Sequence, residues 1–170
     1  MDATVTMTAD AGQAFAELLQ RHRGIVFKVA GSYARDPHDR DDLAQEIAAQ
    51  LWRAWPKYDH ARPFSTWMYR IALNVAISHL RGEAHRRRHA VPLDEALHDA
   101  AFDDAADADT AEGLRILQRF IATLEPLDRA LLLLYLDERS TREMAEVLGI
   151  SESNVTTKIS RLKQRIRAQA

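Results

Sequence analysis

The chain has 170 residues, of which 46% are apolar, and a formal net charge of −2, so it suits one ordinary domain or two small ones with real cores. It contains no cysteine, which excludes disulfides and thiolate metal sites within the chain. The N-terminal segment has no basic stretch followed by an apolar core, so it is no signal peptide. No segment approaches the roughly 20 apolar residues of a membrane span. We therefore expect a soluble cytoplasmic protein with no membrane contact of its own.

Charge is sorted along the chain into basic, acidic and basic blocks. Residues 61–90 carry six arginines against one acid, residues 91–112 carry eight acids and no lysine or arginine, and residues 139–170 carry seven basic residues against three glutamates. Solvated surface charge explains each block alone, but it gives no reason for their order. Two modules that face nucleic acid, joined by an acidic segment, explain that order.

Apolar residues recur at three- and four-residue intervals in the first half of the chain, which predicts amphipathic helices. One helix begins near Gln13, with a break expected at Gly24. The next begins at Asp39–Asp42, whose acids suit the positive end of a helix dipole, and ends at Pro56. Ser65 is placed to cap a third helix. The predicted inward faces contain Phe15, Leu18, Leu19, Ile25, Val26, Val29, Leu43, Ile47, Leu51, Trp55, Met68, Ile71, Ala72 and Val75.

The helical period resumes in the second half after a polar gap. The gap is rich in Asp and Ala and has no apolar period, so it predicts a flexible acidic linker. Apolar residues then recur from Leu114 to Leu124, and a strongly apolar helix follows the break at Pro126. Because no segment alternates with a period of two, we predict an all-α protein. Its expected parts are a disordered N-terminus (1–11), a helical domain (12–89), the acidic linker (90–111) and a second helical domain (112–170).

The segment TREMAEVLGISESNVTTKISR has the residue pattern of a helix-turn-helix. Ala145 supplies a small residue where two helices cross, and Gly149 supplies a turn residue that tolerates positive φ. Ser140 with Glu143 has the spacing of a capping box, and Ser151 is placed to cap the second helix. A helical hairpin with a solvated basic face is the alternative. That alternative does not require the small residue, the glycine and the apolar positions to agree in spacing.

The second helix of this motif, expected from Glu152 to Arg167, offers a polar outer face to DNA. Short side chains near its start can reach base edges, while its lysines and arginines can reach phosphates. The predicted DNA-binding residues are Ser153, Asn154, Thr156, Thr157, Lys158 and Arg161. These residues indicate a DNA-binding module, which many regulators share.

Two segments of the first domain separate the chain from an ordinary DNA-binding regulator. DDLAQEIAAQLWRAW (41–55) and FSTWMYRIALNVAISHLR (64–81) together resemble conserved region 2 of extracytoplasmic-function (ECF, group 4) sigma factors, and the C-terminal segment resembles region 4 of the same family. The resemblance runs from about Phe15 to Arg167. It implies a region 2 helical bundle and a region 4 helix-turn-helix. A protein of this kind binds core RNA polymerase, recognises the −10 and −35 promoter elements and melts DNA for transcription initiation.

The resemblance also implies site residues in region 2. A helix that docks on the polymerase clamp is matched by Asp41, Asp42, Gln45 and Glu46. Contacts with the −10 DNA are matched by Tyr58, Arg62, Phe64, Arg70 and Asn74. The loop that begins at Tyr58 matches the loop that captures a flipped base, and aromatic rings beside arginines suit an unstacked base. Most of these aromatic residues could equally lie in the core, which we favour for Trp67.

Partners follow from the same resemblance. They are core RNA polymerase through its β′ clamp and β flap, promoter DNA, and an anti-sigma factor that holds the chain inactive; the free chain is expected to be a monomer. The resemblance places Arg86, Arg87 and Arg88 near DNA phosphate and the acidic linker in the polymerase, although a simple tether explains that linker equally well. Many relatives carry an arginine where this chain has Thr156, so we expect a different −35 preference.

Two other classes of protein fit the sequence less well. A dimeric repressor with this DNA-binding tail would need a ligand pocket or a receiver of alternating strands and helices, and no strands are predicted. An enzyme would need a catalytic motif, and the chain has no Gly-rich phosphate loop or H-E-x-x-H sequence. His85 and His89 have the helical spacing of metal ligands, but the three arginines between them repel a cation. We therefore predict no catalytic residue, no metal site and no cofactor.

Overall fold

The computed structural model describes residues 2–89 and 108–169, with side chains described for 10–82 and 109–169. Most of the predicted acidic linker and the side chains of the three consecutive arginines lie outside these ranges. No strand occurs in the described ranges, which confirms the all-α prediction. The elements are α1 (Asp2–Arg21), α2 (Arg23–Tyr33), α3 (Pro37–Ala54), a short 3₁₀ helix η1 (Trp55–Lys57), α4 (Phe64–His89), α5 (Ala108–Thr123), α6 (Pro126–Leu136), α7 (Thr141–Leu148) and α8 (Glu152–Gln169).

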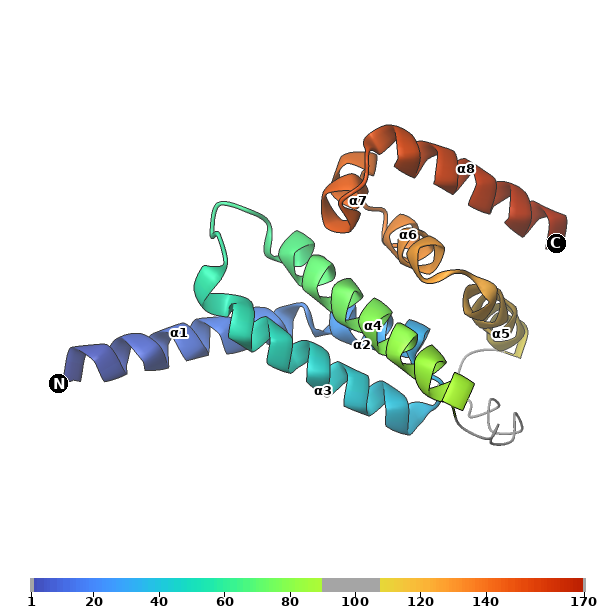
Figure 1. The fold of residues 1–170 in the computed structure, drawn as a ribbon. Helices are drawn as coiled ribbons and strands as arrows, with labels where there is room; N and C mark the ends of the chain where they lie inside the picture. The colour runs from blue at the N-terminus through green and yellow to red at the C-terminus, as the bar shows by residue number, and fades with distance from the viewer. Residues whose placement is uncertain (1, 90–107, 170) are drawn as a thin grey trace.

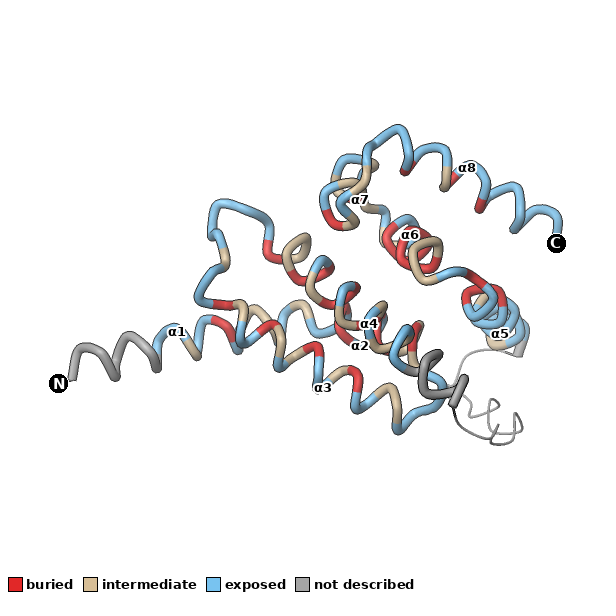
Figure 2. The backbone as a smooth tube through the Cα atoms, in the orientation of Figure 1, coloured by how far each residue is buried: buried red, intermediate tan, exposed pale blue. Residues whose placement is uncertain are grey.

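Helices α2, α3 and α4 pack against one another as the first bundle, and α1 extends from it (Figure 1). Their buried residues lie on the sides that face the neighbouring helices (Figure 2). Leu43, Ile47 and Leu51 of α3 are fully buried, as the spacing predicted. Helix α3 begins at Pro37, slightly earlier than expected, because the carboxylate of Asp36 accepts a 2.7 Å hydrogen bond from the Asp39 N–H.

The boundaries differ from the sequence-based expectation in three places. Residues 1–11 were expected to be disordered, but α1 begins at Asp2, since no proline or glycine interrupts the chain before Gly12. The break expected at Gly24 occurs at His22, between α1 and α2. Ser65 was expected to cap a helix, but it lies inside α4 and its hydroxyl accepts a 2.9 Å hydrogen bond from Arg139.

Helices α5 to α8 form the second bundle, with α6 at its centre. Four consecutive leucines of α6, residues 131–134, are buried. Consecutive residues point in different directions around a helix, so a run of this kind requires cover on every side. Helices α5, α7 and α8 cover part of α6, and α4 of the first bundle covers another part (Figure 1). The two bundles therefore share one continuous apolar core.

Arg129 of α6 joins the two bundles at one end of this helix. The residue is 7% exposed, and its guanidinium donates to the carbonyl oxygens of Ser32 (3.0 Å), Ala122 (3.2 Å) and Leu124 (3.2 Å). The guanidinium also lies 5.1 Å from the ring centre of Tyr33, whose hydroxyl donates a 2.8 Å hydrogen bond to the carbonyl of Pro126. The three carbonyls that accept from Arg129 lie at the C-terminal ends of α2 and α5, where a cation is favoured. Burial lowers the pKa of the Arg129 guanidinium.

Replacing Arg129 tests its contribution to stability. Arg129→Met keeps an apolar stem but leaves three carbonyl oxygens without their donor, so we expect the free energy of unfolding to fall by about 2–4 kcal/mol. For a chain of this size the midpoint of thermal unfolding should fall by roughly 5–10 °C. Circular dichroism measures both. Arg119→Met on the exposed face of α5 is the matched control. An unfolding midpoint equal to that of the control would show that Arg129 does not stabilise the fold through these hydrogen bonds.

Candidate nucleic-acid interface

The turn between α7 and α8 has the geometry that the sequence pattern predicts for a helix-turn-helix. Gly149 adopts a left-handed conformation (φ 67°), and its N–H donates a 2.9 Å hydrogen bond to the carbonyl of Ala145. The Ser140 hydroxyl accepts a 3.1 Å hydrogen bond from the Glu143 N–H at the start of α7. The Ser151 hydroxyl accepts a 3.0 Å bond from the N–H of Asn154 at the start of α8. Local hydrogen bonds thus define both ends of the turn.

Helix α8 turns its apolar side inward and its polar side to solvent. Val155, Ile159 and Leu162 are buried. The predicted DNA-binding residues that are exposed are Ser153, Asn154, Thr156, Thr157 and Arg161. The sixth, Lys158, is half-buried and lies 3.9 Å from the carboxylate of Asp128 on α6. The structure thus presents five of the six residues on an accessible face and places the sixth on the flank of the helix.

The two threonines of α8 have specific hydrogen-bonding capacity. Each hydroxyl donates a 3.0 Å hydrogen bond to the carbonyl oxygen four residues earlier, Thr156 to Glu152 and Thr157 to Ser153. Each hydroxyl therefore has its proton engaged and offers only lone pairs to a partner. Its methyl group remains available for apolar contact. In this rotamer a threonine can accept from an amino group of a base or touch a thymine methyl.

The loop after α3 contains a cluster of aromatic rings. Tyr58 stacks on Trp55, with ring centres 5.3 Å apart and an interplanar angle of 18°, and lies 4.9 Å from Trp67. Its hydroxyl donates a hydrogen bond to the carbonyl of Arg62, which closes the loop. Tyr58 is half-buried, whereas Phe64 is 8% exposed and packs among the other rings. The structure thus makes Tyr58 partly accessible and encloses Phe64.

The polar residues predicted to contact −10 DNA have different surroundings. Arg70 and Asn74 are exposed and lie one helical turn apart on α4. Arg62 is also largely exposed, but its guanidinium lies 2.7 Å from the carboxylate of Glu146 on α7 and 3.9 Å from that of Asp59. Arg62 is therefore paired with a residue of the helix-turn-helix.

The predicted polymerase-binding residues lie on the exposed face of α3. Asp41, Asp42, Gln45 and Glu46 are all exposed. Two of the carboxylates lie near histidines, at 3.6 Å for His38 with Asp42 and 4.0 Å for His79 with Glu46. Trp52, two turns further along α3, is 52% exposed, although its ring lies 5.2 Å from that of Phe15. This tryptophan lies off the inward face that sequence periodicity predicts for α3.

A charged cluster centred on Asp137 links the two bundles, and sequence reasoning missed it. One carboxylate oxygen accepts from Lys28 of α2 (2.9 Å), and the other accepts from Tyr69 of α4 (2.8 Å) and from Arg139 (3.0 Å). Tyr69 is fully buried, so it serves this cluster and the core. Burial by itself would raise the pKa of the Asp137 carboxyl, but the hydrogen bonds from Lys28, Tyr69 and Arg139 outweigh it, and the pKa is lowered.

Two family models match this chain, one over the first bundle and one over the second. Residues 18–86 match the model of Sigma-70 region 2, and residues 114–166 match that of Sigma-70, region 4. The chain is 25% identical over 165 residues to the ECF RNA polymerase sigma factor SigW of Bacillus subtilis, covering 92% of this chain and 88% of the relative. It is 27% identical over 155 residues to SigM of the same organism, covering 89% and 92%. The chain belongs to the ECF sigma factor family.

Family membership confirms the resemblance inferred from residues 41–81 and from the C-terminal segment. This ECF sigma factor recognises promoters and initiates transcription with RNA polymerase. Its relatives are sigma factors and not enzymes of a known class. In the described parts of the chain no helix is long and apolar enough to cross a membrane. The described residues also contain no group of three or more His, Asp or Glu side chains that could hold a metal ion.

Two solved structures resemble this sigma factor in fold. CnrH in complex with the cytosolic domain of CnrY aligns with a TM-score of 0.63 and 23% identity, over 96% of this chain and 94% of the other. The sigma factor RpoE in complex with the anti-sigma factor NepR from Bartonella quintana aligns with a TM-score of 0.68 and 16% identity, over 92% and 96%. At these identities the likeness concerns the fold.

The Asp137 cluster should make contact between the bundles dependent on pH. Because the folded-state pKa is lowered, the carboxylate stabilises the contact above its ordinary pKa of 3.8, and this contribution is lost as the pH falls through the lowered value. At pH 7, Asp137→Asn should reproduce the loss. The chain has no cysteine, so dyes on cysteines introduced at exposed Ala49 and Gln164 report the distance between bundles. We expect lower energy transfer in Asp137→Asn.

Asp10→Asn in exposed α1 removes the same charge away from the cluster and should leave energy transfer unchanged. Far-ultraviolet circular dichroism of each sample separates a change in distance from loss of helix. Energy transfer that stays constant in Asp137→Asn, and also between pH 7 and about pH 3, would refute a role for this carboxylate in holding the bundles together.

Proposed function

We propose that this ECF sigma factor reads the −35 element with α8, contacts the −10 element with the Tyr58 loop and α4, and binds core polymerase through α3. The observation that carries the proposal is the α7–α8 turn, with Gly149 at positive φ and a serine cap on each helix. This turn holds the outer face of α8 clear of its own bundle. A helix presented in this way fits the major groove of DNA.

Base reading by α8 would combine three kinds of contact. Asn154 can pair with an adenine edge, and Arg161 can reach a guanine edge or a phosphate. Thr156 and Thr157 supply acceptor oxygens and methyl groups, because their hydroxyl protons are engaged within the helix. Threonine in place of the arginine common at position 156 supports a −35 preference that differs from the family's usual one.

The residues proposed to contact the −10 element differ in how accessible they are in the structure. Arg70 and Asn74 lie on a regular helix and are exposed without rearrangement. Tyr58 is partly exposed within an aromatic cluster that includes Trp55 and Trp67, and accessible aromatic rings suit contact with an unpaired base. Arg62 must first exchange Glu146 for a phosphate. Phe64 would support the loop from within the core.

Simultaneous contact with both promoter elements requires the two bundles to separate. Positions −35 and −10 are about 25 base pairs apart, which is roughly 85 Å along B-DNA. In the structure the Arg62 guanidinium of the −10 loop lies 2.7 Å from Glu146 of the helix-turn-helix. A compact chain of 170 residues has a radius of gyration of only about 15 Å. We infer that the described arrangement opens when polymerase and promoter are bound.

The proposed polymerase surface is the acidic stripe of α3. Four predicted residues are exposed there, and none of them is needed for the apolar core. Acidic groups on an exposed helix suit a basic partner surface. Trp52 extends the stripe by an apolar contact of the kind that often anchors an interface. The second bundle would contact the other predicted polymerase element, the β flap.

An anti-sigma factor is the proposed regulator. Both solved neighbours in fold were determined with such a partner or with a cytosolic partner domain. A protein that binds across the two bundles would prevent their separation and so keep the sigma factor from its promoter. Because it acts with RNA polymerase, we propose that the protein is located in the cytoplasm.

Two sets of substitutions test the division of labour. Asn154→Ala with Arg161→Ala should weaken binding of reconstituted holoenzyme to promoter DNA by about 30-fold or more, since base contacts contribute roughly 1–3 kcal/mol each, and should leave affinity for core polymerase unchanged. Asp42→Asn with Glu46→Gln should weaken core binding. Fluorescence anisotropy and core pull-down measure the two affinities.

Glu17→Gln on exposed α1 is the control for both assays. The proposal predicts that neither affinity changes in this variant. Loss of core binding in the α8 variant, or loss of −35 recognition alone in the α3 variant, would show that the surfaces are assigned wrongly.

A further inference from the structure

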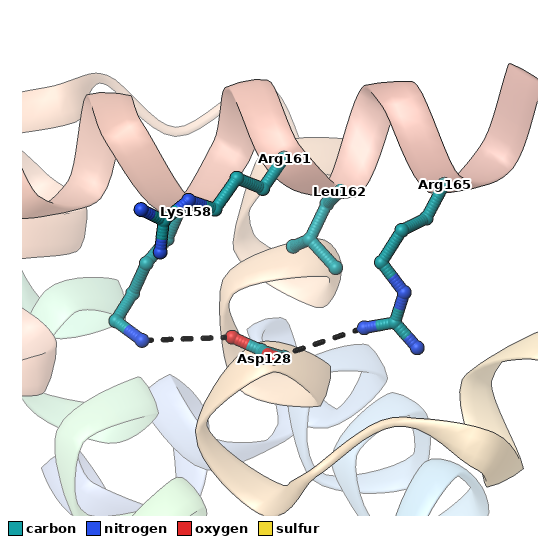
Figure 3. Close-up of a pocket in the computed structure, with 5 residues that line it drawn as sticks. All are labelled: Asp128, Lys158, Arg161, Leu162 and Arg165. Carbon is teal, nitrogen blue, oxygen red and sulfur yellow. Dashed lines mark ion pairs between the residues drawn. The ribbon is translucent and has the colours of Figure 1, made fainter.

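A hollow of about 130 Å³ lies between α6 and α8, on the flank of the proposed DNA-reading helix. Figure 3 shows the residues that line it, Asp128, Lys158, Arg161, Leu162 and Arg165. Three are cations from α8, and the one carboxylate among them comes from α6. The surplus of positive charge distinguishes this hollow from an ordinary helix contact.

The carboxylate of Asp128 faces two of these cations. Its Oδ1 lies 3.9 Å from Nζ of Lys158, and its Oδ2 lies 4.0 Å from a terminal guanidinium nitrogen of Arg165. The two cations are two helical turns apart on α8, and both side chains run toward α6 (Figure 3). The Asp128 side chain is 24% exposed and that of Arg165 is 48% exposed. The carboxylate therefore sits below the cations, on the inner side of the hollow.

Cations on this flank are the groups that DNA phosphates attract. Each lysine or arginine that neutralises a phosphate releases counterions, and this contribution is independent of sequence. A carboxylate within 4 Å of two such cations competes with DNA for them. Because Asp128 is partly shielded from water, salt screens its attraction less than it screens an exposed pair. The separations exceed hydrogen-bond length, so the pairing attenuates the two charges without immobilising them.

We propose that Asp128 is an intramolecular counter-anion that limits the sequence-independent affinity of α8 for DNA. The inference rests on the proposed role of α8 as the helix that reads the −35 element. By opposing two of the cations on its flank, Asp128 leaves recognition more dependent on the outer face, where Ser153 and Thr157 lie. A genome offers about 10⁶–10⁹ competing non-specific sites, so a moderate reduction in phosphate affinity frees much of the protein for its promoters.

A positioning role is the opposite possibility. In that role Asp128 would hold the two cations in the orientation that a phosphate needs, and its removal would weaken DNA binding. Such a role usually requires short hydrogen bonds that define the side-chain geometry. The separations of 3.9 and 4.0 Å, and side chains that run inward to α6, favour competition.

The test is the binding of the full-length chain to a labelled duplex of arbitrary sequence at 50–200 mM salt. Asp128→Asn keeps the shape of the side chain and removes its charge. We expect affinity near 0.1 M salt to rise about 3- to 10-fold and the slope of log K against log salt to steepen by about 1–2, as expected for up to two additional phosphate contacts. Asp109→Asn in the exposed first turn of α5 removes the same charge and should change neither.

A second set of variants assigns the gain to the cations of the hollow. Lys158→Gln with Arg165→Gln should lower affinity for the duplex in the wild-type chain, and Asp128→Asn added to this double variant should give no gain. Thermal unfolding of each variant verifies that the chain is folded. Unchanged or weaker DNA binding by folded Asp128→Asn overturns the proposal, and so does a gain that survives removal of both cations.

Failure of this inference is distinguishable from failure of the proposed function. If Asn154→Ala weakens promoter binding by holoenzyme while Asp128→Asn shows no gain, α8 reads DNA and Asp128 does not limit it. If Asn154→Ala has no effect on promoter binding, the assignment of α8 to the −35 element is wrong, and the inference that rests on it is overturned as well.

Discussion

Helix α6 is buried on all sides, and the arrangement of the whole chain depends on this constraint. Leucines 131–134 follow one another in sequence, so they point around the full circumference of the helix. Helices α5, α7 and α8 cannot cover that circumference alone, and α4 of region 2 completes the cover. An apolar surface of this kind is stable only when water is excluded from it. The two conserved regions of this sigma factor therefore meet in the structure across α6.

Polar contacts at the two ends of α6 define how the two regions pack against each other. Arg129 in its first turn donates to carbonyls from both bundles, and Asp137 just after its last turn accepts from both. If the bundles separate on promoter DNA, one side of α6 loses its apolar cover and both charged residues lose partners. Separation therefore requires another surface to take the place of region 2 on α6.

Carboxylates of this chain also pair with basic residues that are predicted to contact DNA. The net charge of −2 is unusual for a protein that binds DNA, yet basic residues are concentrated on α4 and α8. In the described structure two predicted DNA contacts are paired with carboxylates of other helices, Arg62 with Glu146 and Lys158 with Asp128. DNA must compete with these internal anions, so phosphate attraction is moderated in the free protein.

Features that arise from neighbouring residues are predictable from the amino-acid sequence. The helices, the inward faces of α3 and α8, the left-handed turn at Gly149 and the two serine caps all depend on residues within about one helical turn of one another, and spacing reveals them. Which aromatic rings are enclosed, as Phe64 is, and which charged side chains pair depends on how the helices pack. Lys28 and Asp137 are 109 residues apart in sequence, and no periodicity records such a pairing. Long-range contacts depend on how whole helices pack, and for this chain that packing is set by the burial of α6.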